Sequence, residues 1–153
     1  MVDFFHRNEH MDDQMVKVEV NLDDISGEWL GFLMDKLLEI GVNDVYYTPI
    51  FMKKNRPGIL LSVLCSDKLL EIAEKLIFEE STTLGIRYYP LTVHRLERHF
   101  FKVQTEWGEV SIKQGLLKGK VVQTAPEYED CKKIADVYQI PLKKVFQKVW
   151  SLI

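Results

Sequence analysis

The chain has 153 residues, 46% hydrophobic and 28% charged, which is typical of one globular domain with a sizeable core. A formal charge of −3 differs from the basic charge of general nucleic-acid-binding proteins, so we expect an anion site to be local and no nucleic acid to bind. Two distant cysteines, Cys65 and Cys131, exclude a disulfide scaffold and a zinc ribbon. Without a membrane-length apolar run or a signal peptide, we expect a cytoplasmic protein that does not bind membranes.

Residues 1–15 are polar and acidic, which predicts a flexible tail or linker remnant. His6 and His10 have the spacing of two metal ligands on one helical face, but no helical pattern surrounds them. A single domain is expected over residues 16–153. It begins with a strand over residues 16–22, in which apolar and polar residues alternate.

Helical spacing over residues 25–41 predicts a helix, with Gly41 suited to the position just after its end. Two strands, 42–52 and 58–66, follow, joined by a turn at 53–58 that contains Pro57-Gly58. A second helix is expected over 66–80 with Ser66 as its N-cap, and 86–103 predicts one long strand or two. The order predicts an α+β fold with a ferredoxin-like β-α-β-β-α-β core.

The remaining residues predict a hairpin around Trp107-Gly108, a short strand over 119–124 and two C-terminal helices. Thr124, Pro126 and Glu127 have the spacing of a capping box before the first of these helices. The last helix has one apolar stripe, formed by Leu142, Val145, Phe146, Val149, Trp150 and Ile153. The two helices also resemble a DNA-binding helix-turn-helix, although the first of them is acidic.

Three cations and an amide, Lys53, Lys54, Asn55 and Arg56, are crowded into the turn between two predicted strands. Their mutual repulsion favours binding of an anion, and phosphate suits both the Arg fork and the Lys point charge. The alternative is a solvated hairpin tip whose basic residues keep a sheet edge soluble.

Asp23 and Asp24 follow the first strand and precede a helix, where two adjacent carboxylates could hold magnesium or manganese. The alternative is that they cap the helix, as Ser26 also could. Glu127 and Asp130 likewise either compensate a helix dipole or contact a metal.

Thr82, Thr83 and Arg87 offer two hydroxyl groups and a guanidinium that could surround a phosphate. An ordinary helix-to-strand turn is the alternative, since neither GxxxxGK[ST] nor GxGxxG occurs in the chain. The sequence singles out no catalytic residue.

Several unusual strings, among them "MKKNRPG", "TTLGIRYY" and "PEYEDCKKIA", resemble the C-terminal domain of the LarC family in order and spacing. The resemblance runs from about residue 18 to about residue 145. It implies a CTP-dependent cyclometallase that inserts nickel into pyridinium-3,5-bisthiocarboxylic acid mononucleotide, forming the pincer cofactor of lactate racemase. Manganese or magnesium would accompany CTP.

On this resemblance, Lys53, Lys54, Asn55 and Arg56 would bind the triphosphate, with Thr82, Thr83 and Arg87 beside them. Asp23 and Asp24 would hold the divalent ion, and Glu127 and Asp130 would be further metal contacts. Nickel and the pyridinium mononucleotide would be substrates.

Family members have a long N-terminal domain, which we expect as a partner of this chain and as the source of the nickel ligands. Apo lactate racemase and further copies of the chain are other expected partners. The alternative to a nickel insertase is a non-catalytic oligomerisation or regulatory module that binds a small ligand.

Overall fold

The computed structural model describes residues 8–153, which form two compact units. The first unit comprises Met11–Val93, and the second comprises His94–Ile153 with residues 8–10. Each unit has its own sheet and its own cluster of buried side chains. This division differs from the single domain predicted over residues 16–153, because each sheet is covered by its own pair of helices and needs no shared core.

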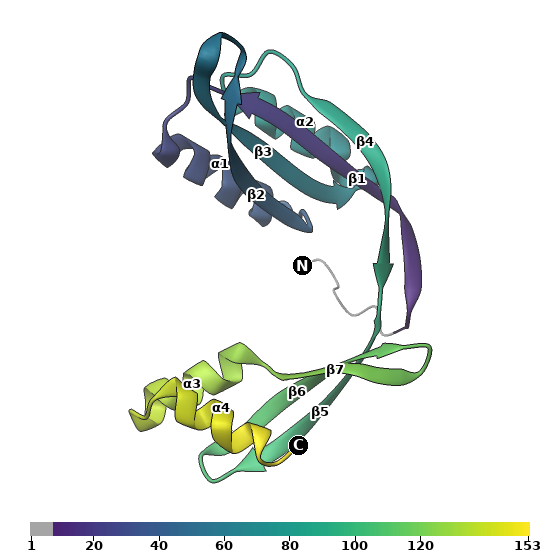
Figure 1. The fold of residues 1–153 in the computed structure, drawn as a ribbon, viewed down its shortest axis with the longest axis vertical. Helices are drawn as coiled ribbons and strands as arrows, with labels where there is room; N and C mark the ends of the chain where they lie inside the picture. The colour runs from purple at the N-terminus through teal and green to yellow at the C-terminus, as the bar shows by residue number, and fades with distance from the viewer. Residues whose placement is uncertain (1–7) are drawn as a thin grey trace. The chain divides into compact units, whose positions relative to one another are not determined.

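The first unit has four strands and two helices in the predicted order (Figure 1). They are β1 (His10–Leu22), α1 (Gly27–Glu39), β2 (Asp44–Met52), β3 (Arg56–Ser66), α2 (Leu70–Glu79) and β4 (Arg87–Arg95). The sheet order is β2-β3-β1-β4, and β3 is antiparallel to both β1 and β2. Strands β1 and β2 therefore run in the same direction, with β3 between them.

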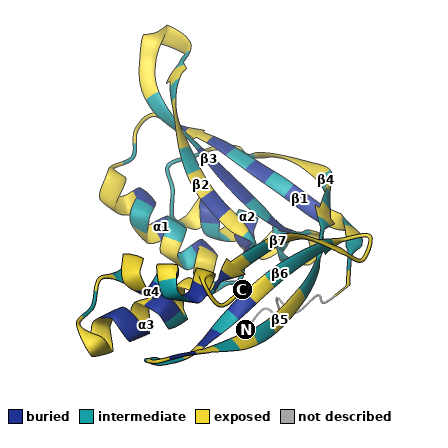
Figure 2. Cartoon of the chain, turned by 60° about the horizontal axis from the view of Figure 1, so that its bottom comes forward, coloured by how far each residue is buried: buried dark blue, intermediate teal, exposed yellow. Residues whose placement is uncertain are grey.

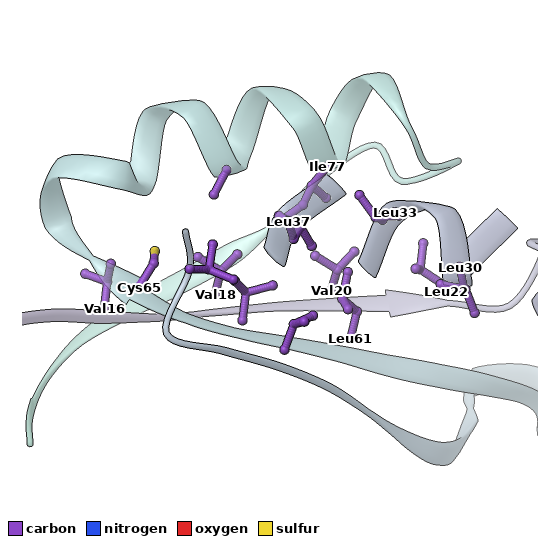
Figure 3. Close-up of a cluster of buried hydrophobic side chains, with 14 residues drawn as sticks. Val16, Val18, Val20, Leu22, Leu30, Leu33, Leu37, Leu61, Cys65 and Ile77 are labelled. Atoms are coloured by element: carbon purple, nitrogen blue, oxygen red, sulfur yellow. The ribbon is translucent and has the colours of Figure 1, made fainter. Parts of the chain in front are cut away.

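Both helices of the first unit cover one face of this sheet (Figure 3). Alternate residues of β1 point towards them, as the sequence predicted. The fully or nearly fully buried members include Val16, Val18, Val20, Leu22, Leu33, Leu37, Leu61 and Ile77. The opposite face of the sheet carries the polar residues Lys17, Glu19 and Asn21 of β1.

Strand β1 begins at His10, so the prediction of a tail reaching residue 15 is wrong for residues 10–15. Met15 is buried, and its pairing with Ser66 starts the ladder to β3. The tail was mispredicted because β4 lies along the other side of β1 and extends the sheet there, although the local sequence is polar. The predicted tail over residues 1–7, with His6, lies outside the described residues.

The β2–β3 turn consists of Lys53–Asn55 alone, and Pro57 and Gly58 lie in β3 opposite Phe51 and Ile50. The prediction of a turn at Pro57-Gly58 is therefore wrong. Pairing of β3 with β1 reaches only Ile59, so Pro57 lies where β3 has one neighbour and its missing N–H is tolerated. A Cβ atom on Gly58 would lie 2.9 Å from the Leu22 carbonyl oxygen, so the glycine permits close approach of β1.

Three predicted helix ends can be compared with the structure. Gly41 follows α1 in the left-handed region (φ 88°), as predicted. Ser66 instead precedes a 3-10 turn at Asp67–Leu69 and makes no capping hydrogen bond, so α2 begins later than expected. The capping box at Thr124 is wrong, because Thr124 lies in a strand and pairs with β6.

The second unit is a three-stranded antiparallel sheet with two helices on one face (Figure 2). It contains β5 (Glu97–Thr105), β6 (Gly108–Leu117), β7 (Lys120–Pro126), α3 (Tyr128–Tyr138) and α4 (Leu142–Trp150), in the sheet order β5-β6-β7. Its fully buried residues are Val110, Ile112, Cys131, Val145 and Val149. In residues 8–153, no helix combines the length and apolar character needed to cross a membrane.

The apolar stripe predicted for the last helix is only partly buried. Val145 and Val149 are fully buried, whereas Trp150 and Ile153 are half exposed. Helix α4 ends at Trp150, so Ile153 does not continue its buried face. The buried side of α4 packs on the sheet of its own unit.

Candidate functional site

The end of β1 is where three segments predicted to share a site meet. Asp23, just after β1, forms an ion pair with Arg56 at the start of β3, with 3.3 Å between Oδ2 and the guanidinium. Asp24, the next residue, accepts a hydrogen bond from the Thr82 hydroxyl in the loop between α2 and β4. The structure therefore brings the two aspartates into contact with Arg56, the residue after the turn, and with Thr82.

Ser26, and neither aspartate, caps helix α1. Its side-chain oxygen accepts a hydrogen bond from the Trp29 backbone N–H at 3.2 Å. Asp23 and Asp24 instead direct carboxylate oxygens at Arg56 and Thr82. The capping alternative is therefore not supported for these two carboxylates.

Arg87 is held against the polar face of β1. Its guanidinium donates to Glu19 at 3.1 Å and to the Asn21 side-chain oxygen at 2.9 Å. Glu19 also accepts from Lys17 and from the Tyr89 hydroxyl, each at 3.0 Å. These donors, Lys17 first, hold the pKa of Glu19 below its usual value and keep it anionic. Arg87 is thus anchored at Asn21, which precedes Asp23 by two residues in the sequence.

The turn residues Lys53, Lys54 and Asn55 are exposed (Figure 2). Lys54 (φ 62°) and Asn55 (φ 57°) both adopt left-handed backbone conformations. Asn tolerates this region, whereas Lys is strained there. No ion pair of the Lys53 or Lys54 side chain is found within residues 8–153, so the two ammonium groups are available to an anion.

Thr83, the remaining predicted phosphate contact, is engaged within its own loop. Its hydroxyl donates to the Gly85 carbonyl at 2.8 Å, and it accepts from the Gly85 N–H at 3.3 Å. Its main role in this structure is to shape the loop that presents Thr82.

A hollow of about 370 Å³ lies beside Asp23 in the first unit. It is mostly apolar, and its lining residues are Leu22, Asp23, Ile25, Pro49, Ile50, Phe51, Pro57, Gly58 and Ile59. Phe51 is 79% exposed although it is a large apolar side chain. An apolar hollow next to clustered charges fits a ligand with a planar ring and an anionic group.

The other two predicted metal ligands belong to the second unit. Glu127 pairs with Lys113 at 3.0 Å, and Asp130 accepts a hydrogen bond from the Ser111 backbone N–H at 2.8 Å. This hydrogen bond lowers the pKa of Asp130. Within residues 8–153, no group of three or more His, Cys, Asp and Glu side chains is arranged to hold a metal ion by itself.

Sequence reasoning missed Glu19 and the lining of the hollow. Glu19 could have been found from the alternation of β1, which assigns Lys17, Glu19 and Asn21 to one polar face. No local pattern identifies Phe51, Pro49 and Pro57 as neighbours of Asp23, because their proximity depends on the register between β2 and β3.

The chain is similar to known proteins of one family. A family model described as "Nickel insertion protein" matches residues 3–146. Curated relatives named pyridinium-3,5-bisthiocarboxylic acid mononucleotide nickel insertion protein include one from Thermotoga petrophila, 42% identical over 90% of this chain and 35% of its own length. Another, from Geobacillus kaustophilus, is 46% identical over 84% of this chain and 31% of its own length. The chain thus spans about a third of these relatives.

Two solved structures are also similar over most of the chain. One is described as LarC2, the C-terminal domain of a cyclometallase involved in the synthesis of the NPN cofactor of lactate racemase. It has a TM-score of 0.85 and 36% identity, and covers 95% of this chain and 98% of that one. The other, protein MK0293 from Methanopyrus kandleri AV19, has a TM-score of 0.70 and 27% identity, and covers 92% of this chain and 87% of that one. The chain therefore belongs to the nickel insertion protein family, LarC, and corresponds to its C-terminal domain.

Proposed function

We propose that this chain is the CTP- and divalent-metal-binding part of a nickel insertase that acts on pyridinium-3,5-bisthiocarboxylic acid mononucleotide. The observation that carries the proposal is the convergence of Asp23, Asp24, Arg56 and Thr82 at the end of β1, beside an apolar hollow. The identity of the metal, nickel, and of the pyridinium substrate is taken from the names of the relatives.

In this proposal the triphosphate of CTP lies against the cationic turn. Arg56 is oriented by Asp23, and its planar fork suits a phosphate oxygen pair. Lys53 and Lys54 add charge from the exposed turn, while Asn55 offers an amide and Thr82 a hydroxyl group. Thr83 shapes the loop, and Arg87 flanks the site from β4.

The hollow next to the turn is the proposed place for the base and ribose. Phe51, Pro49 and Pro57 present flat apolar surfaces there, on which a pyrimidine ring can stack. At about 370 Å³, the hollow lies within the range of small-ligand sites.

Asp23 and Asp24 are the proposed ligands of manganese or magnesium. Their oxygens are the hard donors that these ions prefer, and both ions commonly bind one or two carboxylates together with substrate phosphates. The bound ion would neutralise phosphate charge. Glu127 and Asp130, in the second unit, stay predictions as further metal contacts.

We also propose that the first unit has a ferredoxin-like fold, since β3 is inserted between the parallel strands β1 and β2. The N-terminal part of the family is the proposed partner for nickel insertion, because the relatives are about three times as long as the matched segment. Apo lactate racemase and further copies of this chain are proposed partners as well.

Calorimetry with CTP, ATP and GTP, each with manganese, tests the nucleotide part of the proposal. We expect saturable binding that favours CTP and requires the metal. Absence of binding to all three nucleotides would contradict it and leave a non-catalytic module as the better description.

Two substitutions on the loop between β1 and α1 separate ligand binding from capping. Asp24→Asn keeps an oxygen for the Thr82 hydroxyl but removes the charge, so we expect weaker manganese-dependent CTP binding at nearly unchanged stability. Ser26→Ala removes the observed cap, so we expect a loss of about 1 kcal/mol in unfolding free energy with CTP affinity retained. The opposite pattern would assign the nucleotide elsewhere.

A further inference from the structure

A second hollow, of about 320 Å³, lies within the second unit between the β5–β6 turn and helix α3. Trp107 and Glu109 border it from the turn and the start of β6, and Asp130, Lys133 and Tyr138 border it from α3. The proposed CTP site uses none of these side chains, and Asp130 is predicted only as a further metal contact.

The aromatic wall formed by Trp107 is held in place by its own turn. The buried Thr105 hydroxyl donates to the Gly108 carbonyl at 2.8 Å and accepts from the Trp107 N–H at 3.1 Å. The Trp107 ring is partly buried against the second core. Tyr138 is half exposed on the α3 side of the same hollow. The hollow therefore offers two aromatic rings, one of them on an anchored turn.

The rim of the hollow carries charges of both signs. Asp130 is fixed by the Ser111 N–H, and Glu109 pairs with Lys102 at 2.9 Å. Lys133 lies one helical turn after Asp130 and is exposed. No ion pair of Lys133 with another side chain is found in the part of the chain that the structure describes. This ammonium group is therefore available to an acidic ligand group.

We propose that this hollow binds the pyridinium ring of the mononucleotide substrate. The identity of the ligand rests on the function proposed above. A pyridinium is a flat cationic ring, which aromatic side chains and nearby carboxylates attract. Its thiocarboxylate groups are anionic, which suits Lys133. The volume is at the lower end for ligand sites and fits a substituted ring, with the ribose phosphate extending outwards.

This assignment gives the two units different ligands. The first unit would bind CTP and the divalent ion, and the second would bind the substrate that receives nickel. Each binding event can therefore be removed by substitutions that leave the other intact.

Tryptophan fluorescence tests the assignment, because a stacked pyridinium quenches an indole. The probes are the mononucleotide substrate and nicotinic acid mononucleotide, a pyridinium nucleotide with one ring carboxylate. We expect saturable quenching in the unmodified chain. Trp107→Phe should remove the saturable part, whereas Trp150→Phe, which changes an exposed tryptophan of the same unit, should preserve it. Only linear, collisional quenching in the unmodified chain would overturn the proposal.

Neighbouring lysines on α3 provide a matched pair for calorimetry with the same probes. Lys133→Ala should weaken binding about tenfold or more, the change expected for one charge-assisted hydrogen bond. Lys132→Ala removes an equal charge that does not border the hollow, so affinity should change less than twofold. Equal losses in the two variants would show a general charge effect and overturn the assignment.

Manganese-CTP titrations of the same variants separate this inference from the proposed function. CTP binding without pyridinium binding would refute the second site alone. Pyridinium binding without CTP binding would refute the nucleotide part of the proposed function and leave the second site standing.

Discussion

The two hollows differ in what surrounds them. The first lies at the end of β1 and is lined mainly by proline and aliphatic residues, with an exposed cationic turn beside it. The second is bordered by Trp107 and Tyr138 and by charges of both signs, on a turn anchored by the buried Thr105. Positive charge beside an apolar surface suits a nucleoside triphosphate, whereas aromatic rings with mixed charges suit a zwitterionic ring. One small chain thus contains two hollows of different chemical character, one in each unit.

The cores of the two units also differ. Each core lies between a sheet and two helices. The core of the first unit has fourteen buried residues against a four-stranded sheet, and the core of the second has seven buried residues against a three-stranded sheet. We therefore expect the second unit to have the lower intrinsic stability, since less apolar surface is buried there.

Truncation of the larger core should have the largest effect. Leu33 is fully buried, so Leu33→Ala should cost about 2–5 kcal/mol of unfolding free energy. Amide hydrogen exchange should show lost protection in β1 and β3 with protection retained in β6. Val145→Ala, at a fully buried position of the second core, is the reciprocal control. Equal loss of protection in both sheets would show one cooperative unit and break the comparison.

Arg56→Ala should have the next largest effect, on the first hollow alone. It removes the guanidinium and leaves Asp23 without its partner, so manganese-CTP affinity should fall by about 1.5–3 kcal/mol. Binding of nicotinic acid mononucleotide should not change. Lys68→Ala, at an exposed lysine of the same unit, is the calorimetric control. Unchanged CTP affinity with an intact circular dichroism spectrum would remove Arg56 from the site.

Lys54→Gly should raise stability while weakening CTP binding. Glycine relieves the left-handed strain, about 1–2 kcal/mol, but loses about 0.5–1 kcal/mol through the entropy of the unfolded chain. A net gain of up to about 1.5 kcal/mol should appear in urea unfolding. Asn55→Gly is the matched control, with a smaller gain because Asn tolerates this conformation. If Lys54→Gly leaves CTP affinity intact, the turn is a solvated hairpin tip.

The smallest effect is expected from Glu19→Gln and depends on pH. Because the pKa of Glu19 is lowered in the folded chain, its stabilising contribution is complete above the usual value of 4.5 and is lost as pH falls through the lowered value. On acidification, the free energy of unfolding should thus fall more in the unmodified chain than in the variant, by about 1 kcal/mol or less. Urea unfolding at one pH above and one pH below the usual pKa of 4.5 measures this difference. Glu79→Gln, which removes a carboxylate from an exposed ion pair on α2, is the control. An unchanged acid dependence in Glu19→Gln would contradict the anchoring of Arg87 by this carboxylate.

Much of the first unit was predictable because its signals are local. Val16, Val18 and Val20 alternate with polar residues, and a two-residue period assigns them to one face of a strand. Leu30, Leu33 and Leu37 repeat at the spacing of a helix and are buried in α1, as expected. The strings that resemble the LarC family were equally visible, and the family is confirmed.

Turns and caps were predicted less well, because several residues can serve the same local purpose. Pro57-Gly58 is a common turn pair, yet the register between β2 and β3 places the turn at Lys53–Asn55. Thr124 had the spacing of a cap, but its pairing in β7 extends the strand past it. Hydrogen bonds to a neighbouring strand outweighed the local preference in both places.

By itself the sequence determined which elements form and to which family the chain belongs, because side-chain periodicity and unusual strings are properties of neighbouring residues. The tertiary structure decided which charges meet. Asp23 and Arg56 are 33 residues apart, Asp24 and Thr82 are 58 apart, and Glu19 and Arg87 are 68 apart. These contacts depend on the strand order β2-β3-β1-β4, which places the hairpin turn and the loop before β4 at the end of β1. No local pattern pairs these charges, because their contacts follow from burying one face of the whole sheet beneath both helices.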